Sequence, residues 1–155
     1  MLFRSYRPCA RSAPPYSACF ASIRAALVTH SVSPEISIVV PVYNEAANIA
    51  PMAREVAAAF SSEARAWELV LVDDASTDET WKEICAAQQR DARVRGLRHS
   101  RNRGQSAAVW TGIQGSTSPL LCTLDGDLQN DPAELPRMLA LMGEVDFVDR
   151  KSTRL

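Results

Sequence analysis

The chain has 155 residues, of which 46% are hydrophobic and 23% are charged, a composition typical of one globular domain with a core of ordinary size. The formal net charge of -1 argues against a general nucleic-acid-binding protein. No run approaches the roughly 18 consecutive apolar residues of a membrane-spanning helix, so the chain as given is not expected to cross a bilayer.

Residues 1–34 differ in composition from the rest of the chain. They contain four arginines and no acidic residue, and they are rich in Ser, Ala and Pro without a sustained hydrophobic period. A transit-like peptide, a disordered leader and an extension outside the working protein all fit this composition. We therefore leave residues 1–34 out of the predicted fold, and the remaining body of the chain is mildly acidic.

The first predicted strand covers residues 36–40, a β-branched apolar run that is typical of a strand buried on both faces and that ends at Pro41. Asn48 is predicted to cap the helix that follows, with Pro51 tolerated in its first turn. The apolar side chains of this helix recur at helical spacing, at Ile49, Met52, Val56 and Phe60.

A second strand and helix follow in the same order. Residues 68–72 form another continuous apolar run. Ser76, with Glu79 three residues later, makes a capping box that predicts the start of a helix. This helix continues through Trp81 and Cys85, and we expect Trp81 to pack in the core.

The alternation then repeats twice more. Residues 94–99 predict a weaker third strand, residues 104–113 a helix with Trp110 in the core, and residues 119–124 a fourth strand. Residues 145–148 predict the beginning of a fifth strand, and residues 149–155 form an atypical tail.

The helix before the fifth strand has clear start signals. Asp131 is suited to the N-cap, Pro132 to the first helical position and Glu134 to the third. Its apolar face consists of Leu135, Met138, Leu139 and Met142.

The four cysteines give no sign of a metal site. Cys9, Cys19, Cys85 and Cys122 show neither a CxxC pair nor histidines at ligand spacing, which argues against zinc. Cys85 and Cys122 fall in a helical and a strand pattern and are predicted to be buried, reduced thiols. A cytoplasmic protein is therefore expected.

Alternating strands and helices of these lengths predict an α/β fold, a mainly parallel sheet with helices on both faces. Ligands of such sheets bind beyond the carboxyl ends of the strands, where this chain has PVYNE (41–45), DDAST (73–77) and DGDLQND (125–131). Their acids fit a divalent cation, or hydrogen bonds to ribose hydroxyls and base N–H groups. The acids expected in one cleft are Glu45, Asp73, Asp74, Asp125 and Asp127.

Several other sites that use such motifs do not fit. An EF-hand would need glycine at Asn130 and a glutamate at Pro136. The chain has neither a P-loop nor a GxGxxG after the first strand. A phosphatase of the haloacid dehalogenase type, with Asp125 as nucleophile, would need Thr or Val at Gln129.

Four motifs in register, PVYNE, DDAST with DET, RNRGQSAA and LDGDLQNDP, resemble the nucleotide-binding half of the family 2 glycosyltransferases, which have the GT-A fold. DLQ followed by a proline is similar to the branch that includes dolichol-phosphate mannose synthase and the bacterial polyprenyl-phosphate glycosyltransferases. The resemblance covers about residues 35–148, which corresponds to about the first half of a complete catalytic domain of this family.

The resemblance implies roles for the residues on the nucleotide side. Pro41, Tyr43 and Glu45 would line the base and ribose pocket. Of Asp73 and Asp74, one would hydrogen-bond the nucleotide base and the other would support the loop; which does which stays open.

The resemblance also implies a metal site. Asp127 would bind Mg2+ or Mn2+ that bridges the diphosphate of the donor, with Asp125 contacting ribose or metal and Gln129 as a further oxygen ligand. Asp78 with Thr80 is better explained by the start of a helix, because acids in a first turn favour the helix dipole.

Several arginines crowd the segment around the third strand. They fit either a basic edge facing a phosphorylated lipid acceptor or an anionic membrane surface, or a solvated edge strand guarded by charge. We favour the guarded edge. The arginines are Arg93, Arg95, Arg98, Arg101 and Arg103.

The function implied is an inverting, metal-dependent glycosyltransferase that moves a sugar from a UDP- or GDP-linked donor to an acceptor, above all a polyprenyl or dolichyl phosphate. Its location would be cytoplasmic, at the inner face of a membrane if missing C-terminal segments anchor it. Where the family reads VxGxR, this chain reads VDFVDRKSTRL, so we expect nucleotide binding with poor or no sugar transfer. A catalytically silent nucleotide-binding module and, less favoured, a phosphatase using Asp125 are the alternatives.

Overall fold

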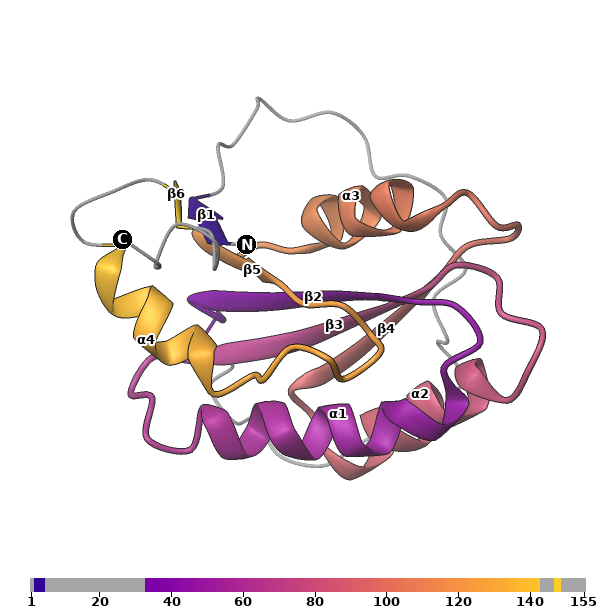
Figure 1. Cartoon of the computed structure of the whole chain (residues 1–155), viewed down its shortest axis with the longest axis horizontal. Coiled ribbons are helices and arrows are strands. Elements are labelled where there is room, and N and C mark those ends of the chain that lie inside the picture. Colours follow the sequence, from indigo (N-terminus) through magenta and orange to yellow (C-terminus); the bar gives the residue numbers. More distant parts are fainter. Residues whose placement is uncertain (1, 5–32, 143–146, 149–155) are drawn as a thin grey trace.

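The computed structural model describes residues 2–4, 33–142 and 147–148, which form a six-stranded sheet flanked by helices (Figure 1). The strands are β1 (Leu2–Arg4), β2 (Ile36–Val42), β3 (Trp67–Asp73), β4 (Val94–Arg98), β5 (Leu120–Thr123) and β6 (Phe147–Val148). The helices are α1 (Ala46–Ala59), α2 (Thr80–Arg90), α3 (Gln105–Gly115) and α4 (Glu134–Leu141). Along the sheet the strand order is β4-β3-β2-β5-β1-β6.

The central strands are parallel. β2 pairs with β3 on one side and with β5 on the other, and β3 pairs with β4, all in parallel register. Helix α1 connects β2 to β3, and α2 connects β3 to β4. The predicted α/β fold, a mainly parallel sheet with helices on both faces, is confirmed.

A short strand from the N-terminal segment lies in the other half of the sheet. β1 sits between β5 and β6 and runs antiparallel to both. The exclusion of residues 1–34 from the fold therefore does not hold for Leu2–Arg4. Three residues carry no periodic signal, and their strand is defined by pairing with β5, which only the tertiary structure supplies. Residues 1 and 5–32 lie outside the described part.

The fifth strand predicted at residues 145–148 is observed as β6 at Phe147–Val148. It pairs with β1 in antiparallel register and so does not extend the parallel part of the sheet. Residues 145–146 and the tail at 149–155 lie outside the described part of the chain.

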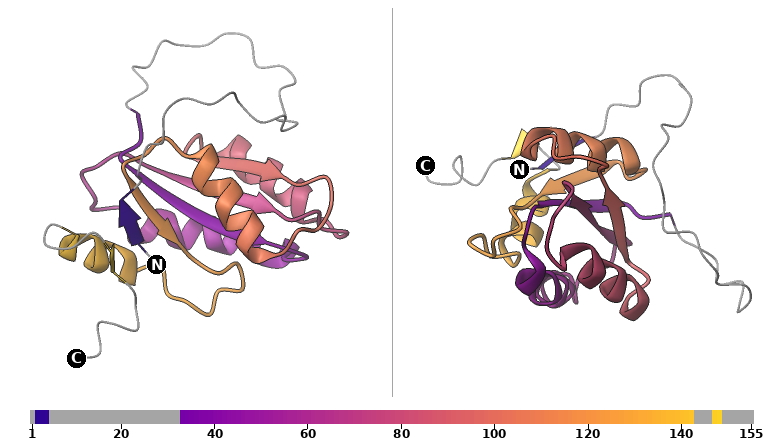
Figure 2. Two further views of the ribbon diagram at one scale, coloured as in Figure 1. Left: turned by 90° about the horizontal axis from the view of Figure 1, so that it is seen from above. Right: turned by 90° about the vertical axis from the view of Figure 1, so that its right-hand side faces the viewer.

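Helices cover both faces of the sheet, with α1 and α2 below it in the view of Figure 1 and α3 above it, as Figure 2 also shows. Helix α4 lies at the left of Figure 1, and its buried side chains belong to the same core cluster as those of α1. Ile38 and Val40 of β2 pack in the cluster that includes the side chains of α1 and α2. Val39, between them, packs with Ala108 of α3. The strands are thus buried on both faces, which explains their continuous apolar runs. None of the helices in the described part is long and apolar enough to span a membrane.

Helix α3 packs against the sheet through small residues. A Cβ on Gly112 would come within 2.3 Å of Val39 Cγ1, so the helix backbone approaches the sheet closely at this glycine. Trp110 is 61% exposed, and its predicted place in the core was wrong. The face of α3 that contacts the sheet contains Ala108 and Gly112, so the largest apolar side chain of this helix does not mark its buried face. Trp81 of α2 is partly buried against the core.

β2 continues past its predicted end, through Pro41 to Val42. Val39 O accepts a hydrogen bond from Leu124 N at 3.1 Å, and Val42 O accepts one from Asp74 N at 2.9 Å. Because successive residues face opposite neighbours, Pro41 faces the side of β5, where the ladder has already ended. The missing N–H of the proline therefore costs no sheet hydrogen bond.

Two predicted helix starts were wrong. Asn48 does not cap α1 but lies inside it, because the helix begins at Ala46. The capping box predicted at Ser76 is not formed, and α2 begins at Thr80. The Ser76 hydroxyl instead accepts a hydrogen bond from the backbone N–H of Asn44 at 2.9 Å. This contact joins two loops far apart in sequence, which local pattern reasoning cannot anticipate.

The start of α4 lies close to its predicted position. The helix begins at Glu134, with Ala133 in the N-cap position, so Asp131 lies two residues before the cap. Asp131 Oδ1 nevertheless accepts a hydrogen bond from Ala133 N at 2.9 Å, and Asp131 O accepts one from Glu134 N at 3.2 Å. The residue types were therefore correct start signals, with a boundary difference of the size common at helix ends.

The two described cysteines form no disulfide. Cys122 is buried in β5, as predicted, and burial raises the pKa of its thiol to about 12. Cys85 is half-buried, less than predicted. Cys9 and Cys19 lie outside the described residues.

Strand β4 is an edge of the sheet, and two arginines, one just before the strand and one within it, pair with acidic side chains. Arg93 Nη2 lies 2.7 Å from Asp91 Oδ2, and its guanidinium stacks 4.1 Å from the centre of the Trp67 ring. Arg95 Nη1 lies 2.7 Å from Glu68 Oε2. These contacts support the interpretation of a strand edge guarded by charge.

Candidate functional site

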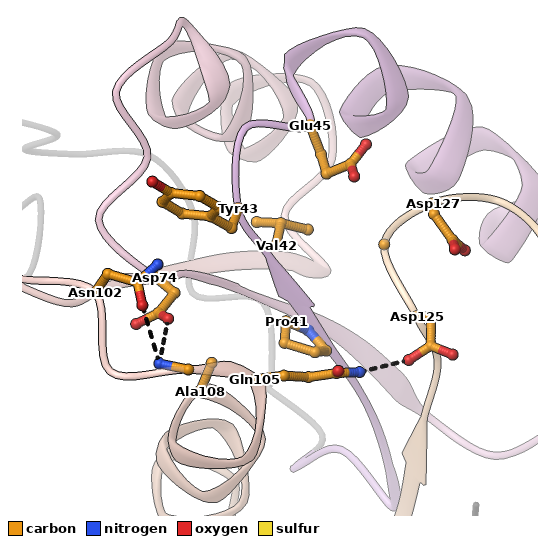
Figure 3. A pocket seen from close by; sticks show the side chains of 12 residues that line it. Pro41, Val42, Tyr43, Glu45, Asp74, Asn102, Gln105, Ala108, Asp125 and Asp127 are labelled. Carbon is orange, nitrogen blue, oxygen red and sulfur yellow. Dashed lines mark hydrogen bonds between the residues drawn. The ribbon is translucent and has the colours of Figure 1, made fainter.

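A pocket of about 420 Å3 opens at the carboxyl ends of β2, β3 and β5, against the N-terminus of α3 (Figure 3). This is the edge of the sheet at which the strand pattern predicted a ligand site. The lining residues are Pro41, Val42, Tyr43, Glu45, Asp74, Asn102, Gly104, Gln105, Ala108, Asp125, Gly126 and Asp127.

Most of the predicted site residues are brought together here. Those that line the pocket are Pro41, Tyr43, Glu45, Asp74, Asp125 and Asp127. Asp73 and Gln129 were predicted beside them but are not among the lining residues. Gln129 is exposed and follows Leu128, whose positive φ of 61° turns the chain after Asp127.

Asp73 supports the loop after β3. Its side chain is fully buried, and Oδ1 accepts a hydrogen bond from Ser76 N at 2.8 Å. Arg98 Nε lies 3.0 Å from Oδ2, an ion-pair distance, but the angle does not make a hydrogen bond, so this oxygen has no hydrogen-bond partner among the described residues. The nearby guanidinium still offsets the buried charge.

Asp74 is the member of the pair that lines the pocket. Its side chain accepts hydrogen bonds on both oxygens: Oδ1 from Arg103 N at 2.9 Å, and Oδ2 from Gly104 N at 2.7 Å. His99 Nδ1 lies 2.6 Å from Oδ1. The carboxylate thus holds the segment before α3 against the end of β3.

The loop after β2 is held by the loop after β3. Asn44 has a positive φ of 56°, and its side-chain oxygen accepts a hydrogen bond from Thr77 N at 2.9 Å. Thr80 Oγ1 accepts one from Glu45 N at 2.8 Å. Tyr43, directly before these two anchors, is 46% exposed at the mouth of the pocket.

Asp78 lies at the start of α2, as the sequence suggested. Its Oδ1 accepts hydrogen bonds from both the backbone N and the hydroxyl of Thr80, at 3.0 and 2.5 Å. The hydroxyl contact is the main cause that lowers the pKa of Asp78. Asp78 is not among the pocket-lining residues, so its role is structural.

The loop after β5 presents two carboxylates that differ in their surroundings. Asp125 is held by two side-chain amides, Gln105 Nε2 at 2.8 Å from Oδ1 and Asn130 Nδ2 at 3.1 Å from Oδ2. Asp127 is exposed, and its Oδ1 accepts a hydrogen bond from Gln129 N at 3.1 Å. The orientation of Asp125 is therefore fixed by its neighbours, whereas Asp127 has free acceptor capacity.

The carboxylate oxygens of Asp125 and Asp127 suit a divalent cation that is coordinated partly by the protein and partly by a bound substrate. The part of the chain that the structure describes contains no group of three or more His, Cys, Asp or Glu side chains placed to hold a metal by themselves. Mg2+ is commonly bound by one or two carboxylates plus substrate phosphates and water. Asp127 and Asp125, in a pocket of this size, fit that mode.

Sequence reasoning missed the contribution of the segment before α3 and of the first turn of this helix. Asn102, Gly104, Gln105 and Ala108 line the pocket, although they were considered only as part of the motif RNRGQSAA and were given no role in the site. The available signal was that this segment also follows a strand, β4, so it reaches the same edge of the sheet. His99 was not singled out at all.

Gly104 is needed for its backbone conformation. It has φ 87° and ψ 159°, a region that only glycine adopts readily, and no atom of the surrounding residues lies within 4 Å of a Cβ built there. Strain alone should make Gly104→Ala lower the free energy of unfolding by about 1–3 kcal/mol. Urea denaturation measures this, with Ser106→Ala, at an exposed position of the same helix, as control. Equal stability of the two variants would contradict the strain argument.

The fold and the pocket define an α/β protein with acidic loops gathered at the carboxyl edge of its sheet. The model of the family "Glycosyl transferase family 2" matches residues 37–149. The chain therefore belongs to glycosyl transferase family 2, as its four motifs suggested.

Two relatives illustrate the similarity in sequence. The undecaprenyl-phosphate 4-deoxy-4-formamido-L-arabinose transferase of Salmonella gallinarum is 39% identical over 111 residues, which are 71% of this chain and 34% of that protein. The dodecaprenyl-phosphate galacturonate synthase of Rhizobium johnstonii is 43% identical over 107 residues, 68% of this chain and 32% of that protein. The chain thus spans about a third of the length of these relatives.

Solved structures confirm the GT-A fold class. A mannosyltransferase from Pyrobaculum calidifontis, solved with GDP-Man and Mn2+, has a TM-score of 0.57 at 20% identity and is matched over 85% of this chain and 36% of its own. Glucosyl-3-phosphoglycerate synthase from Mycobacterium tuberculosis, solved with Mn2+ and UDP, also has a TM-score of 0.57 at 20% identity, over 70% of this chain and 39% of its own.

Proposed function

We propose that this chain forms the donor-binding part of an inverting glycosyltransferase that moves a sugar from a UDP- or GDP-linked donor to a polyprenyl phosphate. The observation that carries the proposal is the convergence of Asp74, Asp125 and Asp127 on one pocket at the carboxyl edge of the sheet. Family membership and the two polyprenyl-phosphate relatives support the reaction class and the acceptor.

The nucleoside would occupy the side of the pocket between Tyr43 and Asp74. Tyr43 offers an exposed aromatic face for stacking, and Asp74 offers a carboxylate for a base N–H group. Glu45 points toward the space between this side and Asp127 in Figure 3, where its oxygens could accept hydrogen bonds from ribose hydroxyls. Asp73 stays a support of the loop and Gln129 is left out of the site.

The diphosphate would lie near the loop after β5. Asp127, with its free acceptor capacity, would hold Mg2+ or Mn2+, and Asp125 would reach the same ion or the ribose from its fixed position. When bound, such an ion supplies positive charge that stabilises the departing diphosphate. Without it, the nearby carboxylates would repel the donor's phosphates.

The proposed reaction is a single displacement at the anomeric carbon of the donor sugar. A phosphate oxygen of the acceptor attacks the anomeric carbon from the face opposite the donor diphosphate. The bond between that carbon and the β-phosphate oxygen breaks, and its electron pair leaves with the nucleoside diphosphate. Because the polyprenyl phosphate is already anionic, this step requires no strong general base.

The acceptor places the reaction at a membrane. A polyprenyl chain stays in the bilayer, so its phosphate would be presented to the pocket at a membrane surface, and we propose the cytoplasmic face. The names of the two relatives support the polyprenyl-phosphate acceptor, from which the membrane surface follows; the choice of the cytoplasmic face is part of the proposal alone.

Calorimetric titration of UDP and GDP, with Mn2+, with Mg2+ and with EDTA, tests the proposal without requiring sugar transfer. We expect one of the two nucleotides to bind at least about tenfold more tightly with the metal, because the ion offsets the repulsion between carboxylates and phosphates. Chelation should reverse the gain. Affinity for neither nucleotide, or affinity that ignores the metal, would contradict the proposed function.

A further inference from the structure

One buried histidine lies beside the pocket, next to the carboxylate of Asp74. His99 follows β4 and is 4% exposed. Its Nδ1 lies 2.6 Å from Asp74 Oδ1, and its Nε2 lies 2.8 Å from the hydroxyl oxygen of Thr111 in α3. Both nitrogens of this buried ring therefore contact side chains, one from the loop after β3 and one from α3.

The hydrogen-bond roles of the ring follow from its partners. A carboxylate only accepts, so the proton on Nδ1 points at Asp74. In the neutral ring, Nε2 then accepts the hydrogen bond of the Thr111 hydroxyl; in the charged ring, Nε2 donates to the same oxygen. The contact between His99 and Asp74 is the same in both cases, so it does not depend on the protonation of the ring.

Asp74 is also the point where several pocket elements meet. The same carboxylate accepts hydrogen bonds from the backbone N–H groups of Arg103 and Gly104, and Gly104 precedes the first residue of α3. Fixing the rotamer of Asp74 therefore sets both the carboxylate that faces the pocket and the position of the helix start beside it. Among the described residues, only His99 hydrogen-bonds this carboxylate through its side chain; Arg103 and Gly104 do so through their backbone N–H groups.

We propose that His99, oriented by Thr111, is a positioning residue that holds the Asp74 carboxylate in the orientation that recognises the nucleoside of the donor. This inference rests on the proposed function. His99 acts through Asp74 and is not placed in contact with the nucleotide. It is separate from the metal side of the pocket, where Asp125 and Asp127 lie on the loop after β5.

Two substitutions separate the two nitrogens of the ring. The amide of asparagine can place an N–H near the position of Nδ1, so His99→Asn should keep the contact with Asp74. The longer glutamine places its amide near the position of Nε2, so His99→Gln should keep the contact with Thr111 but lose the hydrogen bond to Asp74. Loss of a hydrogen bond to a charged group corresponds to about a tenfold or larger effect.

The test compares the affinity for the nucleoside diphosphate that the wild-type chain binds with the affinity for inorganic pyrophosphate, both measured with Mn2+. For His99→Gln we expect about a tenfold loss for the nucleotide and an unchanged affinity for pyrophosphate, which lacks a base. His99→Asn should retain at least half of the nucleotide affinity. A merely structural role of His99 would weaken both ligands together.

The outcomes distinguish this inference from the proposed function. The role of His99 is overturned, and the proposed function stands, if the wild-type chain binds nucleotide with Mn2+ and His99→Gln binds it equally well. The same conclusion follows if His99→Gln loses as much affinity for pyrophosphate as for the nucleotide. If the wild-type chain binds neither UDP nor GDP, the proposed function fails and the inference falls with it. If His99→Gln does not fold, Thr111→Val decides: it should weaken the nucleotide about threefold and leave pyrophosphate unchanged, and an equal effect on both ligands overturns the role.

Discussion

Replacing Asp127 by asparagine should remove most of the gain in nucleoside-diphosphate affinity that Mn2+ provides, a loss of about tenfold or more when Mn2+ is present. Substitution of groups that merely support a metal ligand costs about 10- to 100-fold in metal affinity, so loss of the ligand itself should reach the upper end of that range. The amide keeps the size of the side chain and an oxygen that can still accept the hydrogen bond from Gln129 N, so the loop should keep its shape.

The absence of metal provides the first comparison. With EDTA, Asp127→Asn should bind the nucleotide at least as well as the wild-type chain, because a carboxylate that repels phosphate has been removed. Calorimetry with and without Mn2+ measures both effects. An Asp127→Asn variant that keeps the full gain from Mn2+ would place the ion elsewhere.

Asp131 supplies a matched control in the same loop. It is an exposed aspartate four residues further on, outside the pocket, and its Oδ1 accepts a hydrogen bond from Ala133 N. Asp131→Asn removes the same charge and keeps an acceptor oxygen for that N–H group. Its nucleotide affinity should stay within about twofold of wild type, because exposed charges at this distance are screened by salt.

Replacing Gly126 by alanine should both destabilise the protein and weaken metal-dependent nucleotide binding. A Cβ at this position would lie 2.8 Å from Val42 Cγ1 and 2.9 Å from Pro41 O, and the second of these is backbone that has little freedom to move. We expect a loss of about 1–3 kcal/mol in the free energy of unfolding, the usual cost of overpacking. Urea denaturation measures this loss.

The consequence for binding follows from the position of Gly126 between the two aspartates. If the clash is relieved by moving the loop, Asp125 and Asp127 move with it, and the gain in affinity from Mn2+ should fall by about tenfold, since misplaced ligands lose coordination. Gly104→Ala is the matched comparison, because it strains a glycine on the α3 side of the pocket without a clash. A Gly126→Ala variant with wild-type stability and wild-type metal dependence would show that the close approach is unimportant.

Part of the site could be predicted because strands in a parallel sheet end at the same edge. That geometry predicted that Glu45, Asp74, Asp125 and Asp127 share one cleft, and all four line the pocket. It did not distinguish Asp73 from Asp74, because neighbouring residues at a strand end differ only in the direction of their side chains. The structure shows that Asp73 turns into the protein and Asp74 lines the pocket.

Errors in the predicted elements came from contacts that join distant segments. Ser76 has the residue type of a helix cap, but its hydroxyl oxygen instead accepts a hydrogen bond from the backbone N–H of Asn44 in another loop. Pro41 marks the end of a strand in most contexts, yet here its nitrogen faces the side of β5, whose pairing with β2 has already ended, while the pairing with β3 continues. Trp110 was predicted in the core, whereas Ala108 and Gly112 form the face of α3 that packs against the sheet.

The sequence by itself determined the α/β alternation, the parallel sheet, the acidic edge and the family, because hydrophobic period and strand-end residues are local properties of the chain. Only the tertiary structure decided which carboxylate of a pair lines the pocket, how Gln105 orients Asp125, and that His99 contacts Asp74. Hydrogen bonds between side chains depend on distances of a few tenths of an ångström between segments that are far apart in sequence, and these distances are set by packing.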